Sequence, residues 1–114
     1  MTSAITTHVL DISRGHPAIG VAVALEIRSG DAWKPLGNGL TDETGRCNTL
    51  LPENGRLDPG TYRLLFNAGA YYHAQHMETF YAEIPIVFEV RHPEAHYHIP
   101  LLLSPYGYST YRGS

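Results

Sequence analysis

Two imidazoles stand two positions apart near the C-terminal end of this chain, in the segment HYHIPLLL. On a β-strand, His96 and His98 would project from the same face, because side chains alternate between the two faces of a sheet. A third imidazole, His8, lies in an N-terminal segment where Val9 takes the core face and Thr6, His8 and Leu10 take the other. A neutral imidazole can take a proton near neutral pH and is also a common metal ligand. These residues could therefore support proton transfer or metal binding.

A metal site built from His8, His96 and His98 would have an open position for water. Imidazoles that bind a metal are usually oriented by a carboxylate behind them, and no carboxylate stands at a readable spacing here. An HxH pair also arises easily by chance in a chain with seven histidines. We therefore predict no physiological metal. The other histidines fall in turn-like or helical segments and are assigned no role: His16, His73, His76 and His92.

A single guanidinium, Arg46, directly follows the turn sequence DETG and begins a short expected strand. Arginine is always charged and presents a planar fork of donors, which suits both a surface ion pair and an anion site. The pattern alone leaves both readings open. Its neighbour Cys47 is the only cysteine, so it cannot form an internal disulfide, and we expect a small buried apolar side chain.

Two-residue alternation predicts the elements that must position these groups. In VAVALEIR, the apolar side chains of Val21, Val23 and their face-mates share one face, and Ile84 begins a similar run. Pro85 lacks a backbone donor, so that second run is expected at a sheet edge or a bulge. The segment AGAYYHAQHM, residues 68–77, lacks alternation and predicts a short helix.

The whole pattern predicts an all-β fold, a two-sheet β-sandwich with one short helix, in a single domain over residues 1–114. The turn SPYG is expected to join the last two strands as a hairpin, so the C-terminal tail would be part of a strand. We expect about eight strands: 5–12, 18–28, 31–40, 46–50, 60–67, 84–91, 96–103 and 106–112.

Composition excludes several classes of partner. The net charge is −3 and the eight Lys and Arg residues are dispersed, which argues against nucleic acid. No apolar run approaches the ~18 residues that a membrane span needs. The N-terminal segment has no basic and apolar leader pattern, so we expect a cytoplasmic protein, or a periplasmic one if a precursor segment has been removed. Leu10 and Leu102 lie beside imidazoles on non-core faces, which indicates cover by a second subunit.

Three motifs together resemble the transthyretin family, and within it the hydrolase branch that acts on 5-hydroxyisourate. They are HVLDISRGHPA (8–18), TDETGRC (41–47) and HYHIPLLLSPYGYSTYRGS (96–114). The hormone-carrier branch of the family shares the LSPYGYST region but lacks other residues of the pattern. The residues that distinguish the hydrolase branch from the carrier branch are, in this chain, His8, Arg46, His98, Tyr111, Arg112, Gly113 and Ser114.

The resemblance implies an enzyme that opens a ring amide of 5-hydroxyisourate to give 2-oxo-4-hydroxy-4-carboxy-5-ureidoimidazoline in purine (urate) breakdown. It implies that His8 and His98 act jointly as general base, that Arg46 holds the ring and stabilises the oxyanion, and that no cofactor is required. It also implies a homotetramer with a channel and a site at each subunit interface. The tail residues would form the channel floor and bind substrate: Tyr111, Arg112, Gly113 and Ser114. The alternative is a binding protein that holds a small aromatic ligand in the same channel without turnover.

Overall fold

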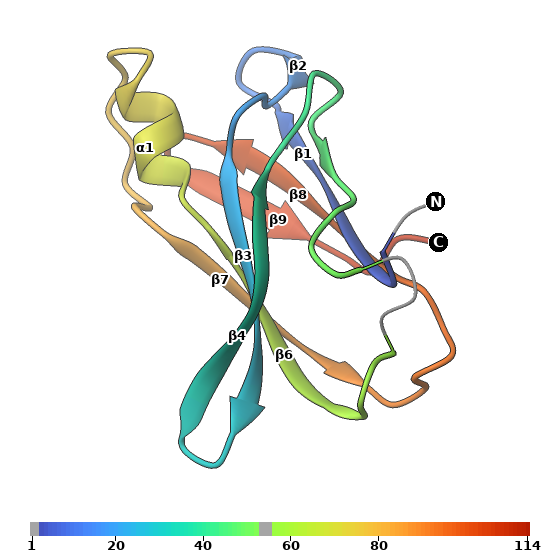
Figure 1. The fold of residues 1–114 in the computed structure, drawn as a ribbon. Coiled ribbons are helices and arrows are strands. Elements are labelled where there is room, and N and C mark those ends of the chain that lie inside the picture. The colour runs from blue at the N-terminus through green and yellow to red at the C-terminus, as the bar shows by residue number, and fades with distance from the viewer. Residues whose placement is uncertain (1–2, 53–55) are drawn as a thin grey trace.

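The computed structural model describes residues 3–52 and 56–114, which form two stacked β-sheets with one short helix at one end (Figure 1). One sheet has the order β4-β3-β6-β7, with every neighbouring pair antiparallel. Its strands are β3 (Ala22–Ser29), β4 (Ala32–Leu40), β6 (Gly60–Phe66) and β7 (Ile84–Val90). The expected two-sheet sandwich is confirmed.

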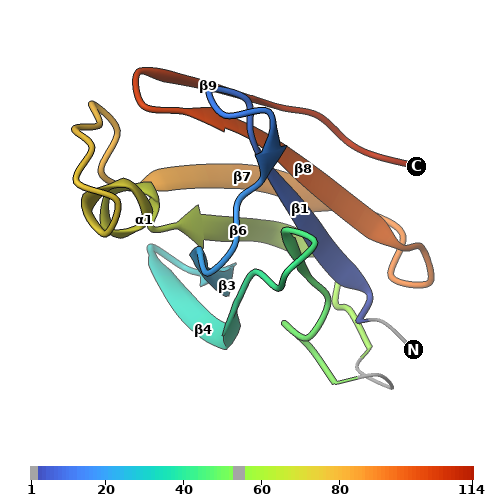
Figure 2. The same ribbon diagram turned by 90° about the horizontal axis from the view of Figure 1, so that it is seen from above.

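The other sheet carries the N-terminal and C-terminal strands, which lie side by side across one face of the sandwich (Figure 2). Its order is β2-β1-β8-β9, and β5 pairs with β1 beside β2. β1 runs parallel to β8, whereas β8 and β9 form the expected antiparallel hairpin. Its strands are β1 (Ile5–Asp11), β2 (His16–Pro17), β5 (Arg46–Cys47), β8 (Tyr97–Ser104) and β9 (Gly107–Thr110).

The core lies between the sheets and contains the side chains that alternation assigned to it. On β8, Tyr97, Ile99, Leu101 and Leu103 are each at most 5% exposed. The residues between them on β8 face away from the core. Cys47 is buried and free, as expected. The faces of the strands therefore follow from the two-residue period.

Several predicted boundaries are wrong by a few residues. The strand expected over 18–28 begins only at Ala22, because Gly20 has a φ of 80° and turns the chain first. The strand expected over 46–50 has two residues, and the last strand ends at Thr110. β2 was not expected. Pro85 lies in β7, which is an edge strand, as its missing N–H requires.

The helix α1 (Ala68–His73) is shorter than the predicted helix over 68–77. Asn67 begins it by accepting a hydrogen bond from the backbone N–H of Ala70 at 3.0 Å. The chain then leaves the helical path, because His76 has a φ of 58°, in the left-handed region. No helix of the described residues is long and apolar enough to cross a membrane.

A buried carboxylate joins the end of β1 to α1. Asp11 is 0% exposed, and its oxygens accept hydrogen bonds from the Ser13 N–H at 3.1 Å and the Tyr71 hydroxyl at 2.9 Å. Burial raises the pKa of Asp11, but the hydrogen bonds from Ser13 and Tyr71 outweigh burial and hold this pKa below its usual value. The charged form of Asp11 therefore stabilises the fold at neutral pH.

Candidate active site

Three strands bring His8, Arg46 and His98 to the outer face of the sheet that contains β1 and β8. His8 on β1 is directly opposite Arg46 on β5 in an antiparallel pair. Thr6 on the same face of β1 is directly opposite His98 on the parallel strand β8. Residues that pair directly share a face, and so do residues two apart on one strand. The three residues expected from the sequence are therefore neighbours on one surface.

The turn before β5 fixes Arg46 beside His8. The Asp42 carboxylate accepts hydrogen bonds from the backbone N–H groups of Thr44 at 2.8 Å and Arg46 at 3.0 Å. Gly45 has a φ of 81°, and a β carbon there would lie 2.5 Å from the carbonyl oxygen of Val9. Only glycine allows this turn to lie against β1. The DETGR sequence thus sets the start of β5.

His8 has a defined protonation pattern. Its Nε2 lies 2.9 Å from the carbonyl oxygen of Thr44. A carbonyl oxygen can only accept a hydrogen bond, so Nε2 of His8 carries the proton and donates it. In the neutral ring the lone pair is then on Nδ1. His8 can accept a proton only through that nitrogen.

His98 is half-buried and remains neutral near pH 7. Burial lowers its pKa, and the neighbouring His96, His8 and Arg46 side chains lower it further because they oppose a positive charge on the His98 ring. The usual pKa of histidine, about 6.5, is already below 7. His98 is therefore available as a proton acceptor at neutral pH.

Thr6 is a part of this site to which sequence reasoning assigned no role. Its Oγ1 lies 2.8 Å from His98 Nδ1 and 3.2 Å from His96 Nε2. The two imidazoles are nearly parallel, with an interplanar angle of 13°. The only signal in the sequence was that Thr6 shares the non-core face of its strand with His8. Nothing else in the sequence marks Thr6 as a site residue, because its hydrogen-bond partners are about ninety residues further along the chain.

The C-terminal tail reaches the site through Gly113. The Gly113 N–H donates to the His98 carbonyl at 2.7 Å, as an isolated antiparallel bridge. A β carbon on Gly113 would lie only 2.6 Å from Cδ2 of His98. The tail backbone therefore packs directly against this imidazole. The prediction that the tail is part of a strand is wrong beyond β9, which ends at Thr110, and the tail instead contacts β8 through this isolated bridge.

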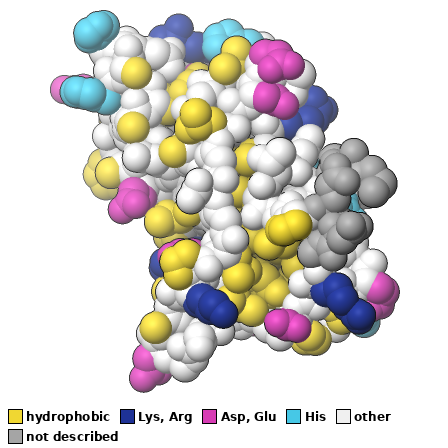
Figure 3. Space-filling model, viewed as in Figure 1, with side chains coloured by type: hydrophobic (Ala, Val, Ile, Leu, Met, Phe, Trp, Pro, Cys, Tyr) yellow, Lys and Arg dark blue, Asp and Glu magenta, His cyan; other side chains and the backbone are white. Residues whose placement is uncertain are grey.

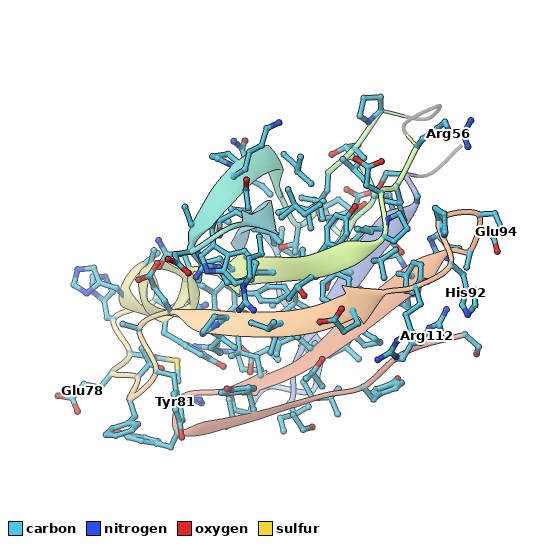
Figure 4. The ribbon with its side chains drawn as sticks, turned by 90° about the horizontal axis from the view of Figure 1, so that it is seen from below. Arg56, Glu78, Tyr81, His92, Glu94 and Arg112 are labelled. Atoms are coloured by element: carbon cyan, nitrogen blue, oxygen red, sulfur yellow. The ribbon has the colours of Figure 1, made fainter. Side chains whose placement is uncertain are left out.

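Tyr111 and Arg112 lie on the other side of the tail in the single protomer. The Arg112 guanidinium lies 4.5 Å from the centre of the Tyr97 ring and donates to the His96 carbonyl at 3.3 Å. Figure 4 shows Arg112 between the tail and β8. Both residues line a groove of about 400 Å³ against β7. Tyr97 and His98 alternate on β8, so this groove is separate from the surface of His8, Arg46 and His98 within one chain.

The site is an open surface in the single chain. A cavity of about 370 Å³ lined by residues of β2 and α1, among them Pro17 and Tyr71, contains none of His8, Arg46 and His98. The imidazoles visible in Figure 3 gather mainly at the end of the molecule where α1 and β2 lie. Within residues 3–52 and 56–114, no three His, Cys, Asp or Glu residues are arranged to hold a metal ion.

Comparison with known proteins identifies the family of this chain. The family model described as the HIUase/Transthyretin family matches residues 5–113. The chain belongs to this family. A 5-hydroxyisourate hydrolase of Salmonella dublin is 46% identical over 110 residues, which cover 96% of this chain and 80% of that protein. A probable 5-hydroxyisourate hydrolase of Caenorhabditis elegans is 47% identical over 113 residues, covering 99% of this chain and 83% of the relative.

Solved structures of both branches of the family share the fold. The 5-hydroxyisourate hydrolase of Klebsiella pneumoniae has a TM-score of 0.86 and 37% identity, with 100% of each chain covered. Sea bream transthyretin in complex with thyroxine has a TM-score of 0.88 and 34% identity, covering 96% of this chain and 94% of that one. The backbone alone does not separate an enzyme from a carrier within this family, so the side chains of the site must do so.

Proposed function

We propose that this protein is an enzyme that hydrolyses 5-hydroxyisourate to 2-oxo-4-hydroxy-4-carboxy-5-ureidoimidazoline in urate breakdown. The observation that carries the proposal is the common surface of His8, Arg46 and His98, which come from three strands. Relatives that are 40% to 47% identical over most of the chain are named as 5-hydroxyisourate hydrolases, which supports the same substrate.

The imidazoles supply the base. Water must lose a proton as its oxygen attacks the ring carbonyl, and a positioned general base contributes ~10²- to 10⁴-fold. We assign this proton transfer to the pair of His8 and His98, of which His98 has the lowered pKa and is half-buried. The low pKa keeps the ring unprotonated at neutral pH, so that it can accept the proton of water. When the ring C–N bond breaks, the proton passes to the leaving nitrogen.

Arg46 supplies fixed positive charge. As water adds, the carbonyl oxygen of the substrate gains negative charge, and a preorganised donor there contributes on the order of 10²-fold or more. Arg46 lies directly across from His8, which suits it to hold the flat ring while the imidazoles act on water. These steps use protein groups only, and the proposal requires no cofactor.

We further propose that the site is completed in a homotetramer. Leu10 and Leu102 are half-buried in the single chain, on the same outer face as the imidazoles. Tyr106, in the turn that joins β8 to β9, is 68% exposed. A second copy that covers this face would enclose the substrate. The tail residues Tyr111, Arg112, Gly113 and Ser114 would then bind the substrate at the interface between copies.

A binding protein for a small aromatic ligand is the competing function, because sea bream transthyretin, with thyroxine bound, has the same fold. Ultraviolet absorbance of freshly generated 5-hydroxyisourate separates the two functions. We expect catalytic amounts of the protein to accelerate the loss of substrate absorbance over many turnovers. A change limited to one equivalent per site would support binding alone and contradict the proposed activity.

Single substitutions test the assignment of the site. We expect His8→Ala, Arg46→Ala and His98→Ala each to lower kcat by about tenfold or more while the protein stays folded, because all three side chains lie outside the core. His73→Ala and His92→Ala are the matched controls and should be near wild type. A control variant that loses as much activity as the site variants would contradict the assignment of His8 and His98 to the site and of His73 and His92 to no role.

A further inference from the structure

Thr6 lies between two imidazoles where β1 and β8 run side by side. Its hydroxyl oxygen is 2.8 Å from His98 Nδ1 and 3.2 Å from His96 Nε2. Thr6 is only 3% exposed. A buried hydroxyl is rarely left without hydrogen bonds, and here ring nitrogens are the partners on both sides. The three side chains therefore form one hydrogen-bonded chain, in the order His98, Thr6, His96.

The direction of this chain decides the chemistry of His98. A hydroxyl has one hydrogen, so Thr6 can donate to only one of the two rings. If it donates to His98 Nδ1, a neutral His98 carries its proton on Nε2 and has no lone pair there. If it donates to His96 Nε2, it accepts from the Nδ1–H of His98, and the Nε2 lone pair of His98 is free. Of these two arrangements, only the second leaves His98 a base at Nε2.

We infer that Thr6 is a positioning residue that accepts a hydrogen bond from His98 Nδ1–H, donates its own proton to His96 Nε2, and so holds the lone pair of His98 on Nε2. The inference rests on the proposed function, because general base catalysis needs that lone pair. The proton of the attacking water goes to Nε2 of His98. The Nδ1 proton stays in place, and its bond to Thr6 strengthens as the ring becomes charged.

The surroundings of His98 favour a dedicated acceptor at Nδ1. The charged and titratable groups that act on His98 are His8 from β1, Arg46 from β5 and His96 from the segment before β8. All of them oppose a positive charge on the ring. The hydroxyl of Thr6 is then the neighbour that stabilises the Nδ1–H group, with His96 as the acceptor that orients this hydroxyl.

The opposite end of the ring is held by the tail. Gly113 packs against Cδ2 of His98, the carbon bonded to Nε2, and its N–H is bonded to the His98 carbonyl. His98 is thus restrained at Nδ1 by Thr6 and at Cδ2 by Gly113. A flip of the imidazole about its Cβ–Cγ bond would exchange Nδ1 with Cδ2 and so break the hydrogen bond to Thr6.

The tautomer of His98 can be measured without any substrate. Nitrogen-15 NMR of the imidazoles at pH 8, where His98 is neutral, distinguishes a protonated from an unprotonated nitrogen, and a His98→Gln sample identifies the signals. We expect the wild-type protein to carry the proton of His98 on Nδ1. We expect Thr6→Val to move it toward Nε2, and Thr6→Ser to keep it on Nδ1. A wild-type His98 protonated on Nε2 would overturn the inference, whether or not the protein hydrolyses 5-hydroxyisourate.

Kinetics then separate positioning from structural support. We expect Thr6→Val, which keeps the shape and removes the hydroxyl, to lower kcat about tenfold or more with little change in KM, and Thr6→Ser to restore most of it. Thr7→Val is the matched control, because its hydroxyl donates to the Ile99 carbonyl at 2.6 Å on the core face. That control should lower the melting temperature and leave kcat near wild type. Full kcat in Thr6→Val would refute the role of Thr6, whereas failure of the wild-type protein to turn over 5-hydroxyisourate would refute the proposed function alone.

Discussion

The tightest contact between the C-terminal tail and the site is made by Gly113, and one added methyl group tests it. In Gly113→Ala, the new β carbon would lie 2.6 Å from His98 Cδ2 and 3.3 Å from Pro100 Cγ. Carbon atoms in contact are ordinarily about 3.5 to 4.0 Å apart. The tail and the imidazole must therefore separate by about 1 Å in the variant, which pulls on the bridge between Gly113 and the His98 carbonyl.

The size of the expected effect follows from this displacement. A misplacement of about 1 Å at a reacting group can cost on the order of 10²-fold in rate. We therefore expect kcat/KM of Gly113→Ala to fall by about 10- to 10²-fold. The loss of one backbone hydrogen bond should cost only about 0.5 to 1.5 kcal/mol in the free energy of unfolding, because the tail contributes little to the core.

Initial rates from the absorbance of 5-hydroxyisourate, together with thermal unfolding, would check both expectations. Gly107→Ala in the same hairpin is the matched control, since a β carbon there meets nothing nearer than Ser104 Oγ at 3.8 Å. We expect this control to keep both its rate and its melting temperature. Equal rates for Gly113→Ala and wild type would refute the reasoning that the tail positions His98.

The remaining predictions concern pH, the buried carboxylate and the assembly. Because the pKa of His98 is lowered from its usual 6.5, the acid limb of kcat/KM should have its midpoint below pH 6.5; an acid limb centred at pH 7 or above would contradict this. Asp11→Asn should lower the free energy of unfolding in urea by about 1.5 to 3 kcal/mol, since a buried, hydrogen-bonded charge is lost, and the exposed Glu89→Gln should not. The folded-state pKa of Asp11 lies below 3.8, so its contribution to wild-type stability is complete above that pH and is lost as the pH falls through the lower value; a stability that does not decrease on acidification would count against it. Light scattering at micromolar concentration should give the mass of four chains, and a monomer would contradict the interfacial site.

The sequence by itself determined the faces of the strands. Alternation is a local property of the extended backbone, so it placed Leu101 in the core and His98 on the outer face without knowledge of any partner strand. The turn before Arg46 was also readable, because Asp42 and Gly45 act within a few residues of each other. Pro85 indicated an edge strand through its missing donor. The motifs identified the family for the same reason, since each is a short continuous segment.

Local patterns failed where a boundary depended on distant packing. The helix was predicted to continue to residue 77, but α1 ends at His73, and His76 has a left-handed backbone conformation that no helix accommodates. The strand that contains Cys47 was predicted too long, because β5 pairs with β1 over only two residues. Composition cannot reveal how far a partner strand extends, since the hydrogen bonds that define a strand are made with another part of the chain.

The tertiary structure alone decided which groups meet at the site. The parallel register of β1 and β8 places Thr6 opposite His98, and the bridge from the tail places Gly113 against the same imidazole. A shift of that register by two residues would keep Thr6 and His8 on the outer face and still leave His98 without its hydroxyl partner. The alternation within each strand would be unchanged by such a shift. The sequence therefore determined the face on which each side chain lies, and the pairing of strands far apart in the chain determined its neighbours.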